Sequence, residues 1–262
     1  MTEDSSCAAV VGDHLVLVTD LDGTLLAGSE AHRRTLRELV LEEKNRISLV
    51  FATGRGIDTI VEILADPLVA APRYIIADVG ATVVRGDTLE PVLPLQHEIA
   101  ACWPGTDTVL KRLAGFPSLK MAFPCERRCG FSFHGPALDP AIVAETERMG
   151  CSYLVTGDDF VEVLPRGVSK GTTLVRLLAQ EDWSCERIVV AGDSMNDLSL
   201  FEQDVRGIVV GNAQPRLVER VAGRPGVFFS TVPGAGGILD GLAALGLEVA
   251  SRTDSAEDVR WP

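Results

Sequence analysis

Two carboxylates stand two positions apart at the end of an apolar run, in the stretch VLVTDLDGTLL. The run that precedes Asp20 and Asp22 has the composition of a buried strand. Burying an unpaired carboxylate is costly, and burying two close together costs more. The pair therefore indicates a nearby positive group, and the rest of the sequence must distinguish a metal ion, a lysine or only water.

Other polar groups follow further apolar runs in the same way. Thr53, Gly54 and Arg55 follow a run in FATGRG, and Asp193 and Asp197 follow another in VVAGDSMNDLSLF. Ligands of open α/β sheets bind beyond the carboxyl ends of the strands. Turns that contain glycine can also point backbone N–H groups at an anion there. These residues are therefore candidates for one shared site.

A lysine completes the set, because Lys170 stands at the start of a predicted helix in PRGVSKGTTL. Taken singly, these residues have ordinary explanations: Asp193 could cap a helix, Thr53 could stabilise a turn, and Lys170 could be a solvated surface lysine. Their joint placement favours a site in which carboxylate oxygens hold Mg²⁺ and Lys170 adds a second positive charge. The predicted metal-binding residues are Asp20, Asp22, Asp193 and Asp197.

The elements that must position these residues alternate along both ends of the chain. Strands are predicted at 14–19, 47–52, 74–77, 187–191, 207–210 and 227–229, and helices at 30–43, 57–64, 169–180, 196–201 and 214–221. Continuous Val, Ile and Leu runs separated by helices are typical of a parallel sheet covered on both faces. The fold class predicted is α/β, with a Rossmann-like, doubly wound parallel sheet as its core.

The middle of the chain has a different pattern. Helices are predicted at 106–113 and 140–149, and strands at 119–123, 130–134, 152–156 and 160–164. This separation of helices and strands is typical of an α+β unit with a small antiparallel sheet. We predict a core made of residues 1–91 and 164–247, an inserted domain at 92–163 and a flexible tail at 248–262.

Composition narrows the possible partners. The 262 residues include 24 Lys and Arg and 37 Asp and Glu, which gives a net charge of −13. An acidic chain disfavours nucleic acid or an anionic membrane as the main partner, so a small molecule is expected. No apolar run is long enough to span a membrane, and the acidic N-terminus does not resemble a secretory signal. We expect a cytoplasmic protein whose six scattered cysteines are free thiols.

At these residues the sequence resembles the haloacid dehalogenase superfamily of phosphotransferases. DLDGT at 20–24, Thr53, Lys170 and GDSMND at 192–197 match its four motifs in order. The insert lies between the second and third motifs, which is typical of members with a C2 cap domain. That branch includes Cof-like sugar phosphatases, sucrose-phosphate phosphatases and phosphomannomutases.

The resemblance implies a role for each matched residue. Asp20 would attack phosphorus and form an aspartyl-phosphate, and Asp22 would act as general acid and base and offer its backbone carbonyl to Mg²⁺. Asp193 would complete the protein ligands, and Asp197 would act through water or orient Lys170. Further candidates for phosphate or substrate binding are Thr53, Gly54, Arg55 and Asn212, the last of which could instead cap the next helix.

Within the branch, FATGR, VEVLPRGVSKG, GDSMNDLSLFE and GIVVGNAQPRL are most similar to the sucrose-phosphatase-like group. That group carries a cap lysine where CGFSFH here has Gly130, and Arg127 or Arg128 could replace its charge. We expect a Mg²⁺-dependent phosphatase acting on a disaccharide or pseudo-disaccharide phosphate. The alternatives are a hexose or aminosugar 6-phosphate phosphatase, a phosphomutase, and a non-catalytic sugar-phosphate sensor.

Overall fold

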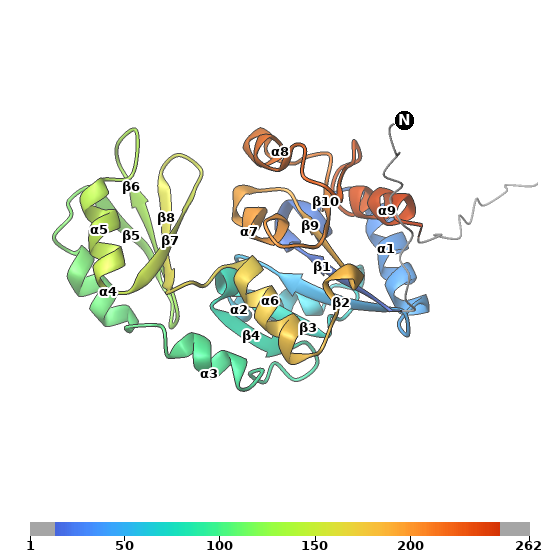
Figure 1. Cartoon of the computed structure of the whole chain (residues 1–262), viewed down its shortest axis with the longest axis horizontal. Coiled ribbons are helices and arrows are strands. Elements are labelled where there is room, and N and C mark those ends of the chain that lie inside the picture. Colours follow the sequence, from blue (N-terminus) through green and yellow to red (C-terminus); the bar gives the residue numbers. More distant parts are fainter. Residues whose placement is uncertain (1–13, 247–262) are drawn as a thin grey trace, which may run out of the picture.

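The computed structural model describes residues 14–246, and it contains two sheets of different construction. The predicted tail at 248–262, the N-terminal segment and Cys7 lie outside these residues. Figure 1 shows the two units side by side, and the smaller one is formed by the middle of the sequence (green to yellow). No helix within 14–246 is both long and apolar enough to cross a membrane.

The larger sheet has seven strands in the order β11-β10-β9-β1-β2-β3-β4. Its strands are β1 (Leu15–Thr19), β2 (Ile47–Ala52), β3 (Tyr74–Ala77), β4 (Thr82–Arg85), β9 (Ile188–Gly192), β10 (Arg206–Val209) and β11 (Val227–Phe229). All neighbouring pairs are parallel except β3 with β4. The six strands predicted for this sheet are confirmed to within one residue at each end.

The edge strand β4 was not predicted. Only four residues, 78–81, separate it from β3, and a parallel crossover needs about a dozen residues or more. The chain therefore reverses direction and β4 pairs antiparallel with β3. Its short TVVR pattern ends in an exposed arginine, which is typical of an edge strand.

Helices cover both faces of the large sheet (Figure 1). One face packs against α1 (Glu30–Glu42), α2 (Ile57–Leu64) and α9 (Ala235–Ala244). The other packs against α3 (Leu95–Ala100), α6 (Lys170–Gln180), α7 (Leu198–Phe201) and α8 (Pro215–Val221). The central strands are buried along their whole length, which explains why their sequences are continuously apolar.

The smaller unit is an antiparallel sheet in the order β5-β6-β8-β7 with two helices on one face. Its elements are α4 (Thr106–Leu113), β5 (Leu119–Pro124), β6 (Cys129–Phe133), α5 (Pro140–Arg148), β7 (Cys151–Thr156) and β8 (Phe160–Pro165). All of them were predicted. Helix α3 packs instead on the large sheet, where Leu95 and Ile99 are buried. The cysteines at 102, 125, 129, 151 and 185 are free thiols.

Candidate active site

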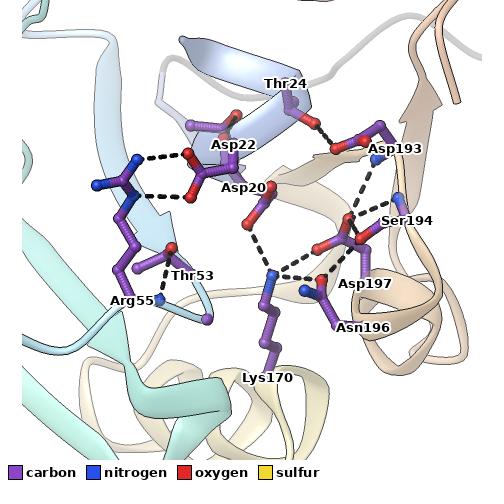
Figure 2. Close-up of polar contacts among 12 residues, drawn as sticks. Asp20, Asp22, Thr24, Thr53, Arg55, Lys170, Asp193, Ser194, Asn196 and Asp197 are labelled. Atoms are coloured by element: carbon purple, nitrogen blue, oxygen red, sulfur yellow. Dashed lines mark hydrogen bonds and ion pairs between the residues drawn. The ribbon is translucent and has the colours of Figure 1, made fainter. Parts of the chain in front are cut away.

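Parallel pairing brings the carboxyl ends of three strands together. Thr19 of β1 is in register with Phe51 of β2 on one side and with Ala191 of β9 on the other. The residues that follow these positions therefore meet at one edge of the sheet (Figure 2). This register gathers Asp20, Thr53 and Asp193 from three separate parts of the sequence.

Lys170 lies at the centre of this cluster and is fully buried. Its ammonium donates to Asp20 Oδ1 at 2.7 Å, to Asp197 Oδ1 at 2.7 Å and to Asn196 Oδ1 at 2.8 Å. Burial alone would disfavour the ammonium, but the nearby carboxylates, Asp197 above all, outweigh it and raise the pKa of Lys170. A cation at a helix N-terminus opposes the helix dipole, so these acceptors are needed to keep Lys170 charged there.

The acidic cluster carries more negative charge than Lys170 can balance. Carboxylate oxygens of Asp20, Asp193 and Asp197 lie within 4.8 Å of one another, and all three residues are buried. Burial, together with repulsion from the neighbouring acids, raises the pKa of Asp20 to about 7. Burial is also the main cause that raises the pKa of Asp193 to about 6. Hard oxygen donors with surplus negative charge fit a Mg²⁺ ion.

The hydrogen bonds of Asp193 and Asp197 distinguish the role of one from the role of the other. Asp197 accepts from Lys170 and from the backbone N–H groups of Asp193 and Ser194, at 3.1 and 3.0 Å. Asp193 accepts from the Thr24 hydroxyl at 2.8 Å. The carboxylate of Asp197 is thus occupied in orienting the loop and Lys170, which suits an indirect role, whereas Asp20 and Asp193 suit direct coordination.

The carboxylate of Asp22 points away from this cluster. Its oxygens accept two hydrogen bonds from Arg55, from Nε at 2.7 Å and from the terminal guanidinium nitrogen at 2.6 Å (Figure 2). The side chain is 57% exposed, so it can reach a substrate. Between Asp20 and Thr24 the chain turns at Gly23, with φ of 81°, and an added Cβ there would collide with Asp193. Only glycine allows these two carboxylate-bearing segments to approach so closely.

A hollow of about 560 Å³ opens beside the cluster, and most of its lining residues directly follow β1, β2 and β9. Its lining comprises Asp20, Asp22, Gly23, Gly54, Arg55, Asp193, Ser194, Asn196 and Gln214. Sequence reasoning did not assign a role to Gln214, although it also follows a strand. It donates its backbone N–H to the Asp193 carbonyl at 2.7 Å.

Two predicted substrate-binding residues are hydrogen-bonded to the backbone of turns. Thr53 is buried, and its hydroxyl accepts from the backbone N–H of Arg55 at 3.1 Å, which shapes the turn. Asn212 donates to the Gly23 carbonyl and accepts from the Gly234 backbone N–H, both at 2.8 Å. Asn212 therefore supports the turn behind Asp22, and the next helix is preceded by Gln214 instead.

Packing within the cap explains why glycine occupies position 130. A Cβ on Gly130 would lie 2.5 Å from the ring of Phe123 and 2.8 Å from the ring of Phe160. A lysine would displace these rings. Arg127 is partly exposed and pairs with Glu126, whereas Arg128 is 6% exposed and pairs with buried acids. Neither arginine is free to take over the lysine's contact in this arrangement.

Fold and site together define the class of protein. The chain has the haloacid dehalogenase fold, with a Rossmann-like core and an inserted cap. A sucrose-phosphatase of Synechocystis, solved with sucrose and phosphate, has the same fold: the TM-score is 0.77 at 24% identity, over 90% of this chain and 99% of that one.

The family follows from the sequence comparison. The profile of the sucrose-6F-phosphate phosphohydrolase family matches residues 13–246, so the chain belongs to this family of phosphoric monoester hydrolases. It is 30% identical to mannosylfructose-phosphate phosphatase of Agrobacterium fabrum, over 88% of this chain and 97% of that protein. It is 34% identical to a glucosylglycerol-phosphate synthase of Pseudomonas anguilliseptica, over 90% of this chain. The match spans only 33% of that longer relative.

Proposed function

We propose that this protein is a Mg²⁺-dependent phosphatase that hydrolyses a sugar phosphate through an aspartyl-phosphate on Asp20. The observation that carries the proposal is the buried cluster of Asp20, Asp193 and Asp197 around Lys170, open to a hollow at the sheet edge. A bound Mg²⁺ would be held by Asp20 and Asp193, where it would lower their pKa values and neutralise charge on the phosphoryl group.

Asp20 is the nucleophile in this proposal. Lys170 bonds its Oδ1, so Oδ2 is the oxygen assigned to the attack on phosphorus. As the new O–P bond forms, the bond from phosphorus to the sugar oxygen breaks and its electron pair leaves with the sugar. Thr53 and the backbone at Gly54 hold phosphate oxygens, and Lys170 balances the charge that develops.

Asp22 supplies the proton that the departing sugar oxygen needs. It later removes a proton from the water that attacks the aspartyl-phosphate, which releases inorganic phosphate and regenerates Asp20. Arg55 pairs with both carboxylate oxygens of Asp22 when no substrate is bound. An arriving phosphate dianion offers Arg55 a competing partner, and the departure of Arg55 leaves the Asp22 oxygens free to contact the substrate.

A disaccharide or pseudo-disaccharide phosphate is the favoured substrate. The name of the mannosylfructose-phosphate phosphatase, which this chain matches over nearly its full length, supports this choice. The inserted unit at 92–163 is assigned to substrate recognition, and its position 130 has no room for a lysine because Phe123 and Phe160 pack against it. Sucrose 6-phosphate itself is therefore not the first choice.

The test is phosphate release from a panel of disaccharide, hexose and aminosugar phosphates, with Mg²⁺ and with EDTA. We expect hydrolysis of a disaccharide phosphate with Mg²⁺ and reversible loss of activity with EDTA. Highest activity on hexose or aminosugar 6-phosphates would favour that alternative. An isomerised sugar phosphate without free phosphate would indicate a mutase. Binding without any turnover would indicate a sensor and contradict the proposal.

A further inference from the structure

A second buried cation lies where the cap meets the core. Arg128 immediately precedes β6 of the cap and is 6% exposed. Its guanidinium donates to Asp78 of the core at 2.9 Å, to the Gly54 carbonyl of the core at 2.7 Å, and to Glu162 of the cap. We call these four residues the arginine clamp. One guanidinium thus ties the cap directly to the turn that carries Thr53, Gly54 and Arg55.

The core side of the clamp is a strained segment. Asp78 and Val79 have φ values of 52° and 57°, in the left-handed region that a β-branched residue such as valine rarely adopts. Backbone N–H groups of these two residues donate to the carbonyls of Arg55 and Thr53, at 2.9 and 3.1 Å. Residues 78 and 79 therefore fix the phosphate-binding turn through these hydrogen bonds, and Arg128 in turn bonds Asp78.

The same segment also supports the helix that carries the lysine. The hydroxyl of Thr173 donates to the Gly80 carbonyl at 2.9 Å, and a Cβ on Gly80 would collide with the Ser169 carbonyl. Residues 78–80 are thus packed between the phosphate-binding turn and the N-terminus of α6, which begins at Lys170. A displacement of Asp78 would be transmitted to both parts of the active site.

On the cap side of the clamp, Arg128 does not stand in for a lysine at position 130. Arg128 and Gly130 are two residues apart, so they lie on the same face of the sheet, opposite the face that packs on α4 and α5. The rings of Phe123 and Phe160 occupy the space above Gly130, and the Arg128 guanidinium stacks on Phe123 at 4.6 Å. The charge of Arg128 is therefore paired with core residues and is not presented to a sugar.

We propose that Arg128 is a positioning residue that couples docking of the cap to the geometry of the phosphate-binding turn. Hydrolysis of a sugar phosphate, which needs both the cap and the turn, then depends on the clamp more than hydrolysis of a small phosphate ester. The inference rests on the proposed function for its substrate, and on the contacts of Arg128 for everything else.

The first measurement compares two substrates. We define the substrate ratio as kcat/KM for the best sugar phosphate of the panel divided by kcat/KM for p-nitrophenyl phosphate. Arg128→Met should lower this ratio by about 10- to 100-fold, because a small misplacement of a positioned group has effects of this size. Arg112→Met is the matched control, since Arg112 pairs with Glu145 inside the cap and does not reach the core.

Two isosteric variants separate the two halves of the clamp. Asp78→Asn weakens the contact across the units and keeps a residue that tolerates positive φ, whereas Glu162→Gln weakens only the contact inside the cap. Asp78→Asn should lower the substrate ratio more than Glu162→Gln does. These variants also keep the test informative if Arg128→Met, which leaves two buried acids unpaired, fails to fold. Equal losses for both substrates in Arg128→Met and Asp78→Asn would overturn the proposal.

Small-angle X-ray scattering supplies a readout that does not depend on turnover. Arg128→Met and Asp78→Asn should increase the radius of gyration, and Arg112→Met and Glu162→Gln should not. If the wild-type protein hydrolyses no phosphate ester, the proposed function fails while scattering still tests the clamp. An unchanged radius of gyration in both core-contact variants would refute the clamp on its own.

Discussion

Within residues 14–246 two cationic side chains are buried, each with three oxygen acceptors, and they differ in which units of the chain those acceptors belong to. Lys170 bonds Asp20, Asn196 and Asp197, and two of these line the hollow. Arg128 bonds Asp78, Glu162 and the Gly54 carbonyl, and it joins two units of the chain. The comparison separates a charge placed for chemistry from a charge placed to hold parts together.

The type of side chain matches each role. The ammonium of lysine is a compact charge, so Lys170 can bond one oxygen of Asp20 and leave the other for a reacting group. The planar fork of arginine has several donors in fixed directions, so Arg128 can bond acceptors from separate elements at once. The Lys170 cluster contains three carboxylates and one ammonium, so it is suited to bind a metal ion. The four predictions that follow test this difference.

The largest effect is expected at the nucleophile. Asp20→Asn keeps the shape and the hydrogen bond of the buried side chain but removes its nucleophilic oxygen, so kcat should fall by more than about 10³-fold. Phosphate release measures turnover, and circular dichroism melting verifies the fold. Asp66→Asn, which alters an ion pair with Arg33 away from the hollow, is the control and should retain activity. Substantial turnover by Asp20→Asn would remove the chemical half of the comparison.

Removing either Lys170 or Arg128 should destabilise the protein, but only the loss of Lys170 should be offset by magnesium. Lys170→Met and Arg128→Met each leave buried carboxylates unpaired, which costs about 3–5 kcal/mol of unfolding free energy. Mg²⁺ should restore part of the loss in Lys170→Met, because the acids left unpaired there belong to the cluster with Asp193. It should not do so in Arg128→Met. Urea unfolding with Mg²⁺ and with EDTA checks this, and equal recovery in both variants would show that the two sites do not differ in this way.

Magnesium should also stabilise the wild-type protein. A ligand that binds only the folded state at a hundredfold excess over its Kd adds about 2.7 kcal/mol. The corresponding rise in Tm should be lost in Asp193→Asn and kept in Glu162→Gln, since Glu162 lies in the clamp and outside the acidic cluster. Differential scanning calorimetry in Mg²⁺ and EDTA measures this rise. Its survival in Asp193→Asn would argue against Asp193 as a ligand.

The smallest effect is expected on the cap. Gly130→Ala pushes a methyl group against Phe123 and Phe160, which should cost about 1–2 kcal/mol through overpacking. Gly115→Ala is the matched control in the same unit, because no heavy atom lies within 4 Å of its added Cβ. Urea unfolding of both variants gives the difference. A neutral Gly130→Ala would mean that the aromatic rings move freely and that position 130 is open to a larger side chain.

The sequence predicted the large sheet well where each strand is a continuous apolar run. It missed α9, whose sequence AGGILDGLAA contains three glycines. It also missed β4 and α3, because TVVR is short and LQHEIA has no strong periodicity. Both lie in the connection from core to insert, where packing against Tyr74 on β3 and against α6 decides the structure. Local pattern carries little information about such elements.

Within the site, the sequence by itself determined which residues stand at the strand ends. Asp20, Thr53 and Asp193 each follow an apolar run, and a parallel sheet necessarily places such positions along one edge. Lys170 was identified through its motif. These placements follow from local spacing, which can be read from the sequence without knowledge of the fold.

Only the tertiary structure decided which partners the side chains choose. The pairing of Arg55 with Asp22, the support of Gly23 by Asn212, and the clamp formed by Arg128 each join residues at least 33 positions apart. Nothing in their local sequence specifies these contacts. They depend on how strands order themselves and how the cap docks, and the burial that makes them strong exists only once the chain has folded.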